Sequence, residues 1–524
     1  MDFDILHSLK KKIPQHMKLC MASGLIVGLI THFYMLTHKL PNWDDLNCMS
    51  SYGSGDYLGR WFLRFIHATG TKYSIPAIHG FLMILIITLA ACLVLETLHL
   101  KSTTAAILVS ALMVTFPSVA CTMTFMFMAH TSAIAIFMIC LAVYLLRKYR
   151  FGWIPCAILL ICSLGVYQSY ISIAIALMLM GMLVDLLEGK ECKEIFGKGI
   201  LYVIVLVVTV VIYMWLCHVV YPTIDNETYG GVGNMGNIAI TEVPILIARC
   251  YKRFLEYFIW KPFAFMSKTM QICNICVCVL AVVLGVYLLV ATKMYRKVWE
   301  TALFGLVAFF MPLAVAFVYF MAPEVDYSML MLYAYVLIYV TVVMLWEKAL
   351  EYWSTQERKK SLTITAQICS VLVVAVMALS CYSNYLITNK AYFRMELAKD
   401  RVTAYLNRIL ANVEATEGYE NGDQLAILGN FYYKDNPSPV EMDIIDSEPL
   451  REMSGVALEN GLITPGVRDN FIRFYVGFNI TELDDKRKGE LMDTQQYQNM
   501  PVYPEEGSIR LIDDVWVVKL SEER

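Results

Sequence analysis

Two adjacent carboxylates, Asp44 and Asp45, follow the first long apolar segment of the chain. A carboxylate within hydrogen-bond reach of a hydroxyl group can take its proton as the hydroxyl attacks an electrophile, so this pair is a candidate general base. Two neighbouring acids can also bind a divalent cation through oxygen ligands. A solvated loop end is the third interpretation, because carboxylates at a water interface cost little free energy. The position of the two acids in the sequence does not decide among these three interpretations.

Cationic and aromatic residues alternate in the next segment, residues 56–68. In a helix, Arg60, Arg64 and His67 would share one face and the aromatic and aliphatic residues another. This pattern predicts an interfacial helix at the outer leaflet. Cations beside two acids suit a reaction in which a phosphate leaves while a hydroxyl is deprotonated. Anchoring to lipid headgroups is the alternative.

A polar break separates two later apolar segments and contains Tyr167, Gln168 and Tyr170. Their hydroxyl and amide groups can hydrogen-bond the oxygens of a sugar, although an interhelical turn explains them about as well.

An amphipathic run at residues 245–260 carries Lys252 and Arg253 on its polar side. At headgroup level, such cations are well placed for the phosphate of a lipid-linked substrate, and ordinary phospholipid contact explains them equally. Glu324 adds a carboxylate between two later apolar segments, where we expect it to face the same cavity.

Long apolar segments fill most of residues 18–387 and must position these groups. A helix needs about 20 mostly apolar residues to cross ~30 Å of hydrocarbon. Eleven spans are predicted at residues 18–37, 76–95, 103–122, 130–147, 153–165, 168–187, 200–220, 271–291, 302–321, 328–347 and 363–387. The fold class expected is therefore an α-helical polytopic membrane protein.

Basic residues concentrate in alternate loops, which predicts the orientation of the chain. The basic side includes Lys10, Lys11, Lys12, Lys101, Arg147, Lys148, Lys198, Arg296, Lys297, Arg358 and Lys359. By the positive-inside rule this side, with the N-terminus, is cytoplasmic. Residues 38–75, 221–270 and the tail from 388 are then extracytoplasmic.

Composition agrees with a membrane protein and excludes other classes. Hydrophobic residues make up 58% of the chain and charged residues 17%, and the net charge of −3 gives no reason to expect a nucleic-acid partner. The fifteen cysteines lie almost all inside the expected spans and are interpreted as buried thiols. We expect no metal site and no cofactor; a divalent cation at the two acids is possible but not favoured.

The tail changes character after residue 387, which divides the chain into a transmembrane unit, 1–387, and an extracytoplasmic unit, 388–524. Apolar spacing predicts a helix over residues 392–413 that continues from the last span. Strands are predicted at 425–428 and 471–476, and a hairpin at 509–520. We therefore expect a C-terminal α/β domain.

Several short motifs carry a family resemblance. They are Asp44-Asp45, Gly59-Arg60-Trp61, Gly165-Val166-Tyr167-Gln168-Ser169-Tyr170, Met500-Pro501-Val502-Tyr503-Pro504 and Gly507-Ser508-Ile509. In this order and placement the chain resembles the bacterial glucosyl transferase type II family, which includes phage and bacterial O-antigen glucosyltransferases. The similarity extends over nearly the whole chain.

The resemblance implies a membrane glycosyltransferase of the C-type fold in the bacterial cytoplasmic (inner) membrane, with an external active site. It would move a hexose, glucose by the family name, from a polyprenyl-phosphate donor to a cell-surface glycan acceptor. The catalytic acids then map onto Asp44 and Asp45, and the donor-phosphate arginine onto Arg60. A donor with one phosphate does not require a metal to neutralise its leaving group.

Two other classes of function remain. A flippase or exporter of lipid-linked glycans would need cations along a path through the membrane, and few charges lie inside the spans. A non-catalytic membrane scaffold would need only its external domain, and Asp44 and Asp45 would then be replaceable.

Overall fold

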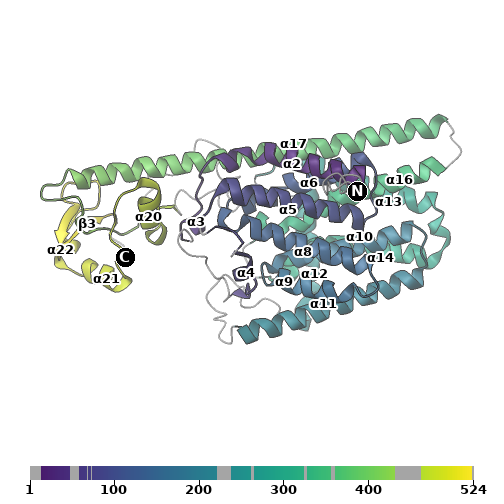
Figure 1. The fold of residues 1–524 in the computed structure, drawn as a ribbon, viewed down its shortest axis with the longest axis horizontal. Helices are drawn as coiled ribbons and strands as arrows, with labels where there is room; N and C mark the ends of the chain where they lie inside the picture. Colours follow the sequence, from purple (N-terminus) through teal and green to yellow (C-terminus); the bar gives the residue numbers. More distant parts are fainter. Residues whose placement is uncertain are drawn as a thin grey trace, which may run out of the picture.

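The computed structural model describes residues 13–47, 58–67, 69–71, 73–220, 238–260, 265–323, 327–355, 360–430 and 462–521. A bundle of apolar helices lies beside a small domain that contains a sheet (Figure 1). The long helices are α2 (Gln15–Thr37), α5 (Pro76–Thr97), α8 (Ala129–Lys148), α10 (Ile171–Leu187), α11 (Cys192–Val220), α13 (Lys268–Ala291), α14 (Val298–Val315), α16 (Val336–Thr355) and α17 (Lys360–Glu414). Shorter helices are α3 (Trp43–Asn47), α4 (Leu63–His67), α6 (Thr103–Thr115), α7 (Pro117–Met123), α9 (Trp153–Leu164), α12 (Val243–Leu255) and α15 (Val318–Met321).

Nine helices in the described part of the chain are long and apolar enough to cross a membrane, or ten if the bent pair α6 and α7 forms one span. The chain is therefore a multi-pass membrane protein. Every expected span coincides with a helix, but the structure supports about nine full crossings where eleven were predicted. Pro117 starts α7 after a 42° bend, because proline cannot continue the hydrogen-bond ladder of α6. Helix α9 has 12 residues, which reach only about 18 Å.

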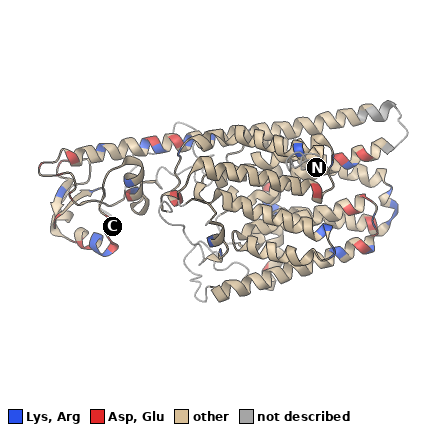
Figure 2. Ribbon diagram, viewed as in Figure 1, with Lys and Arg blue, Asp and Glu red and all other residues tan. Residues whose placement is uncertain are grey.

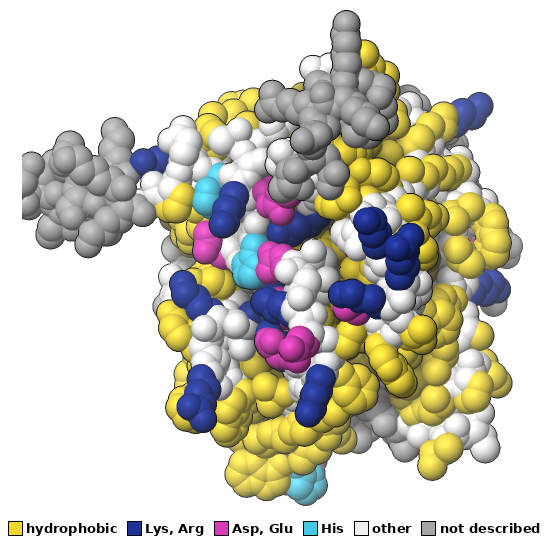
Figure 3. All heavy atoms as spheres, turned by 90° about the vertical axis from the view of Figure 1, so that its right-hand side faces the viewer, with side chains coloured by type: hydrophobic (Ala, Val, Ile, Leu, Met, Phe, Trp, Pro, Cys, Tyr) yellow, Lys and Arg dark blue, Asp and Glu magenta, His cyan; other side chains and the backbone are white. Residues whose placement is uncertain are grey.

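Charged side chains gather at one end of the bundle, which the basic loops predict to be cytoplasmic (Figures 2 and 3). Asp185 at the end of α10 contacts Arg147 at the end of α8 at 3.0 Å, Lys190 at 2.7 Å and Lys198 at 3.1 Å. The two helix ends are thus joined, and the chain that runs between them through α9 returns to the same end of the bundle.

Helix α17 is continuous over 55 residues, or about 80 Å, so it links the bundle to the C-terminal domain without a break at 387/388. It lies along α2 (Figure 1). His32 Nδ1 lies 2.8 Å from the Tyr392 hydroxyl, and Asn389 Nδ2 donates to Thr31 O at 3.2 Å. The prediction that residues 392–413 extend the last span as a helix is confirmed.

The C-terminal domain contains a three-stranded sheet in the order β1-β3-β2. Strand β1 (Leu425–Leu428) is parallel to β3 (Val515–Lys519), and β2 (Ile509–Ile512) is antiparallel to β3. The predicted strand at 425–428 and the terminal hairpin are confirmed. Helical elements in this domain are α20 (Pro465–Phe471), η9 (Ile472–Val476), α21 (Asp485–Met492) and α22 (Gln495–Gln498).

Residues 471–476 were predicted to form a strand, and this is wrong: they are the end of α20 and the π-helical turn η9. Pro465 occupies the first turn of α20, where proline is favoured. Val467 and Phe471 are buried four residues apart, which is a helical spacing. Aromatic and β-branched composition predicted a strand, but packing against the domain core selects the helix.

Candidate active site

The two acids lie on α3, a single helical turn that begins with a capping box. Asn42 Oδ1 accepts a hydrogen bond from Asp44 N at 2.9 Å, and Asn42 N donates to Asp45 Oδ2 at 3.1 Å. These reciprocal bonds satisfy backbone donors at the start of the helix. The local sequence Asn42-Trp43-Asp44-Asp45 therefore fixes the relative orientation of both carboxylates.

Asp45 is buried, with 3% of its surface exposed, and its oxygens are fully engaged. Oδ1 accepts from Ser74 Oγ and from Phe127 N, each at 2.9 Å, in addition to the bond from Asn42. Burial raises the pKa of Asp45 to about 7, and the three donated hydrogen bonds oppose this shift. Asp45 thus joins α3 to two other segments of the bundle.

Asp44 is only half-buried and has a different environment. Burial raises its pKa above the usual value, while the nearby positive charge of Arg60 acts in the opposite direction. A raised pKa and a cationic neighbour are features of a general base near a phosphate. The Asp44 carboxylate interacts with the Trp43 side chain and with the charge of Arg60, and Asp44 is less buried than Asp45. Of the two acids, Asp44 is therefore better placed to meet a substrate.

The shifted pKa of Asp45 predicts a pH-dependent stability. A carboxyl with a folded-state pKa of about 7 and an unfolded value of 3.8 stabilises the fold at low pH, and this contribution is lost as pH rises through 7. We expect the stability of the wild type relative to Asp45→Asn to fall by about 2 kcal/mol between pH 5.5 and 8. Unfolding of both proteins in detergent at the two pH values measures it, and a difference that does not change with pH would contradict the assignment.

Arg60 lies in a loop held tightly by three buried side chains. Its guanidinium stacks over the Tyr167 ring at 4.8 Å. Gln168 Nε2 donates to Leu58 O at 2.6 Å and to the Tyr213 hydroxyl at 2.9 Å, and that hydroxyl donates to Gly59 O at 3.1 Å.

Gly59 lets this loop approach α11 closely. Its φ of +75° is disfavoured for other residues, and a Cβ there would lie 2.5 Å from the Tyr213 hydroxyl. The Arg60 Nε is buried and makes no hydrogen bond within the described residues. The loop therefore presents a fixed cation with unused hydrogen-bonding capacity.

Tyr167, Gln168 and Tyr170 are 4%, 6% and 1% exposed. The rings of the two tyrosines lie 5.0 Å apart, and Gln168 bonds only to protein groups. In this structure these residues support the Arg60 loop, so a direct contact with sugar stays a prediction.

The expected cationic face of an interfacial helix was wrong. Helix α4 covers only Leu63–His67, and Arg60 precedes it. Arg64 is exposed, whereas His67 is 1% exposed and points into the protein. The positive φ of Gly59 excludes a helix that runs continuously from residue 56 through this position.

His67 belongs to a buried group of three imidazoles that a linear reading of the chain does not reveal. The rings of His79 and His130 are stacked at 4.5 Å, and His67 lies 6.5 Å from His130. His67 also stacks on Phe127, whose backbone N–H binds Asp45. Burial lowers the pKa of His67 to about 4, so it is neutral at pH 7. The three imidazoles thus lie next to Phe127, the residue that binds Asp45.

Lys252 and Arg253 lie on α12, the amphipathic helix that the sequence predicts, which buries Leu246 and Phe254. Both cations contact Glu256, at 4.0 and 2.9 Å. Within the part of the chain that the structure describes, their ion pairs are with Glu256 and do not involve Asp44. Glu324 lies outside the described residues, so its predicted position cannot be compared.

The C-terminal domain packs directly on α3, the acid helix that carries Asp44 and Asp45. Leu46, which follows Asp45, is 1% exposed and belongs to the hydrophobic core that includes Val402 of α17 and Trp516 of β3. Tyr475 of η9 stacks on Phe471, with ring centroids 5.1 Å apart. Burial and the nearby charge of Asp45 raise the pKa of Tyr475.

Because of these contacts, α3 is held between the helix bundle and the C-terminal domain. Lys39, at the end of α2, lies 4.7 Å from the Tyr475 ring and closes the same junction. The segment that follows α2 and the C-terminal domain thus meet at the candidate site, a long-range contact that no local pattern could predict.

Comparison with known proteins gives one match. A family model described as glucosyl transferase GtrII matches residues 33–346, which is more than half of the chain. The match contains the acid helix, the Arg60 loop and α12, and it ends before α17, so the motifs at 500–509 lie outside it. No curated protein and no solved structure matches. On this match, and with the membrane-spanning helices and acid site it covers, the chain belongs to the glucosyl transferase GtrII family.

Proposed function

We propose that this membrane glycosyltransferase moves glucose from a polyprenyl-phosphate donor to a cell-surface glycan on the outer side of the inner membrane. The observation that carries the proposal is the half-buried Asp44 beside the rigidly held Arg60 at one end of the bundle. We expect the fold to be of the C type, with a cytoplasmic N-terminus and an external C-terminal domain.

In the proposed reaction, an acceptor hydroxyl gives its proton to Asp44 as its oxygen bonds to the anomeric carbon of the donor sugar. The bond between that carbon and the phosphate oxygen breaks, and the polyprenyl phosphate departs with the bonding electrons. Arg60 stabilises the charge that develops on the phosphate, with a guanidinium fork that matches phosphate oxygens.

Asp45 has a positioning role in this proposal. Its three donors, Asn42 N, Ser74 Oγ and Phe127 N, occupy the carboxylate and hold α3 in place. Arg64, Lys252 and Arg253 are proposed to attract the donor phosphate before it reaches Arg60. Because the leaving group is a monophosphate, the reaction is proposed to need no divalent cation.

Transport is a weaker candidate function. Buried charges in the described spans, such as Asp185, Glu347 and Lys348, lie at the charged end and are paired there. A flippase for an anionic lipid needs cations along the whole path.

A reconstitution assay tests the donor and the orientation. The purified protein in vesicles, with polyprenyl-phosphate glucose in the bilayer, is expected to glucosylate a membrane-impermeant glycan present only on the side of the external domain. UDP-glucose is the matched control and should give no product, since it carries no lipid. A chelator should leave the rate unchanged. Transfer from UDP-glucose alone, or only with acceptor on the opposite side, would contradict the proposal.

A further inference from the structure

An apolar groove runs between α10, α11 and α14 within the membrane-spanning part of the bundle. Its volume is about 510 Å³, and no charged residue lines it. The lining includes Met178, Phe196, Gly199, Leu303, Phe310 and Phe317. Val203 and Leu306 on its rim are 60% and 48% exposed, so the groove opens sideways toward lipid.

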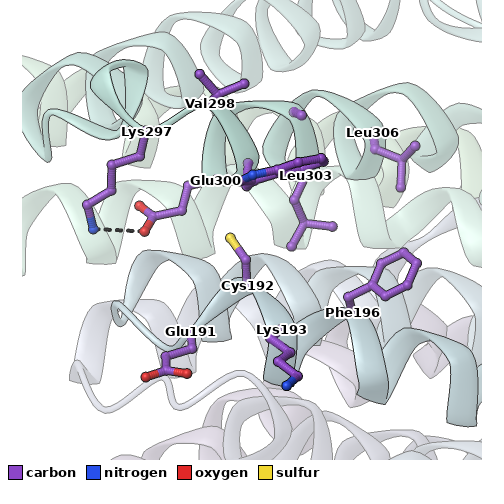
Figure 4. Close-up of a pocket in the computed structure, with 11 residues that line it drawn as sticks. Glu191, Cys192, Lys193, Phe196, Lys297, Val298, Glu300, Leu303 and Leu306 are labelled. Carbon is purple, nitrogen blue, oxygen red and sulfur yellow. Dashed lines mark hydrogen bonds and ion pairs between the residues drawn. The ribbon is translucent and has the colours of Figure 1, made fainter.

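A second pocket, of about 780 Å³, lies between the start of α11 and the start of α14 (Figure 4). It shares Phe196, Leu303 and Leu306 with the groove, so the two adjoin. The charges of this second pocket balance: Lys297 pairs with Glu300 at 2.7 Å, and Lys193 is accompanied by Glu191. An anionic headgroup therefore gains little at this end.

The opposite end of the groove, at Phe317, leads to a cationic helix. Tyr319, two residues further along, has the guanidinium of Arg253 5.8 Å from its ring. Helix α12 packs across α14, where the Tyr251 hydroxyl donates to Phe309 O at 2.6 Å. Lys252 and Arg253 contact the Glu256 carboxylate, and Arg249 donates to the Pro323 carbonyl. Within the residues that the structure describes, these three cations are thus paired with one carboxylate.

We propose that this groove binds the prenyl chain of the donor, with the donor phosphate at the α12 end. A long apolar trough with these three cations at one end fits an amphiphile that has one anionic group and one hydrocarbon chain. The inference rests on the proposed function and assigns the segment that selects long-chain donors. In this position Lys252 and Arg253 attract the donor phosphate first, before it reaches Arg60 for the reaction.

Two glycines on α11 supply a matched test. A Cβ at Gly199 would enter the groove and lie 3.0 Å from the flexible Met182 Cε, whereas a Cβ at Gly197 would meet nothing within 4 Å. Leucine favours the helix at both positions, so neither Gly199→Leu nor Gly197→Leu should disturb α11. Initial rates are measured with a long-chain polyprenyl-phosphate glucose and with farnesyl phosphate glucose.

Gly199→Leu is expected to raise KM for the long-chain donor about tenfold, because buried methylene groups of the chain are displaced. KM for the farnesyl donor, and all values for Gly197→Leu, should stay at the wild-type level. Equal effects of Gly199→Leu on both donors would overturn the groove assignment alone. The same holds if a phospholipid occupies the groove and the long-chain donor does not displace it. A wild-type protein that is inactive with both donors would instead overturn the proposed function, and this inference with it.

Discussion

Asp44→Asn is expected to lower the rate of sugar transfer by about 10²–10⁴-fold, the typical effect of removing a general base. The amide has nearly the same shape as the carboxylate but cannot take the acceptor proton. The Asp44 backbone N–H still binds Asn42, so α3 should form normally. Initial rates, with unfolding temperature and detergent behaviour unchanged, measure the effect.

Asp45→Asn is the matched control because it alters the neighbouring carboxylate that holds α3. Its amide nitrogen cannot accept all three donated hydrogen bonds, so this variant should lose stability as well as activity. If Asp44→Asn, Asp45→Asn and the double variant all keep full activity, the acids have no catalytic role and the scaffold interpretation is favoured.

Arg60→Lys should reduce transfer by about 10–100-fold, the effect of losing one charge-assisted hydrogen bond. Lysine keeps the positive charge but loses the planar fork that binds a phosphate and stacks on Tyr167. The loop itself is held through Leu58 and Gly59, whose carbonyls accept from Gln168 and Tyr213, so the fold should survive.

Arg64→Lys provides the comparison, since Arg64 is exposed and keeps its charge in this variant. It should be nearly silent. Rates at saturating acceptor and varied polyprenyl-phosphate glucose separate the two positions. Equal mild effects of Arg60→Lys and Arg64→Lys would show that charge at the surface suffices, and would remove the specific phosphate role from Arg60.

Hydrophobic length predicted the positions of the membrane helices well, because in lipid each span must satisfy its own backbone. It predicted the number of full crossings less well. Whether α9 crosses the membrane depends on its contacts with the neighbouring helices and with the loop that contains Phe62. In that loop, Phe62 N donates to Gly165 O, just after the end of α9, at 2.8 Å. The strand predicted at 471–476 failed for the same kind of reason, since packing outweighed composition.

The acid helix could be located from the sequence because its residues are adjacent in the chain, and Asn42 supplies a local cap. The different environments of Asp44 and Asp45 could not be predicted from the sequence. They arise from Ser74 and Phe127, which reach Asp45 from elsewhere in the bundle. The support of Arg60 by Tyr213, about 150 residues away, likewise depends on tertiary structure.

Leu46 and Trp516 belong to one hydrophobic core although several hundred residues separate them in the chain. A ribosome therefore makes Leu46 long before Trp516. Until the final strands have been translocated and folded, the acid helix lacks one of the two surfaces that hold it, and its apolar side is open to water. In the proposed orientation, we therefore expect sugar transfer to begin only after the C-terminal domain has been translocated and has folded onto α3.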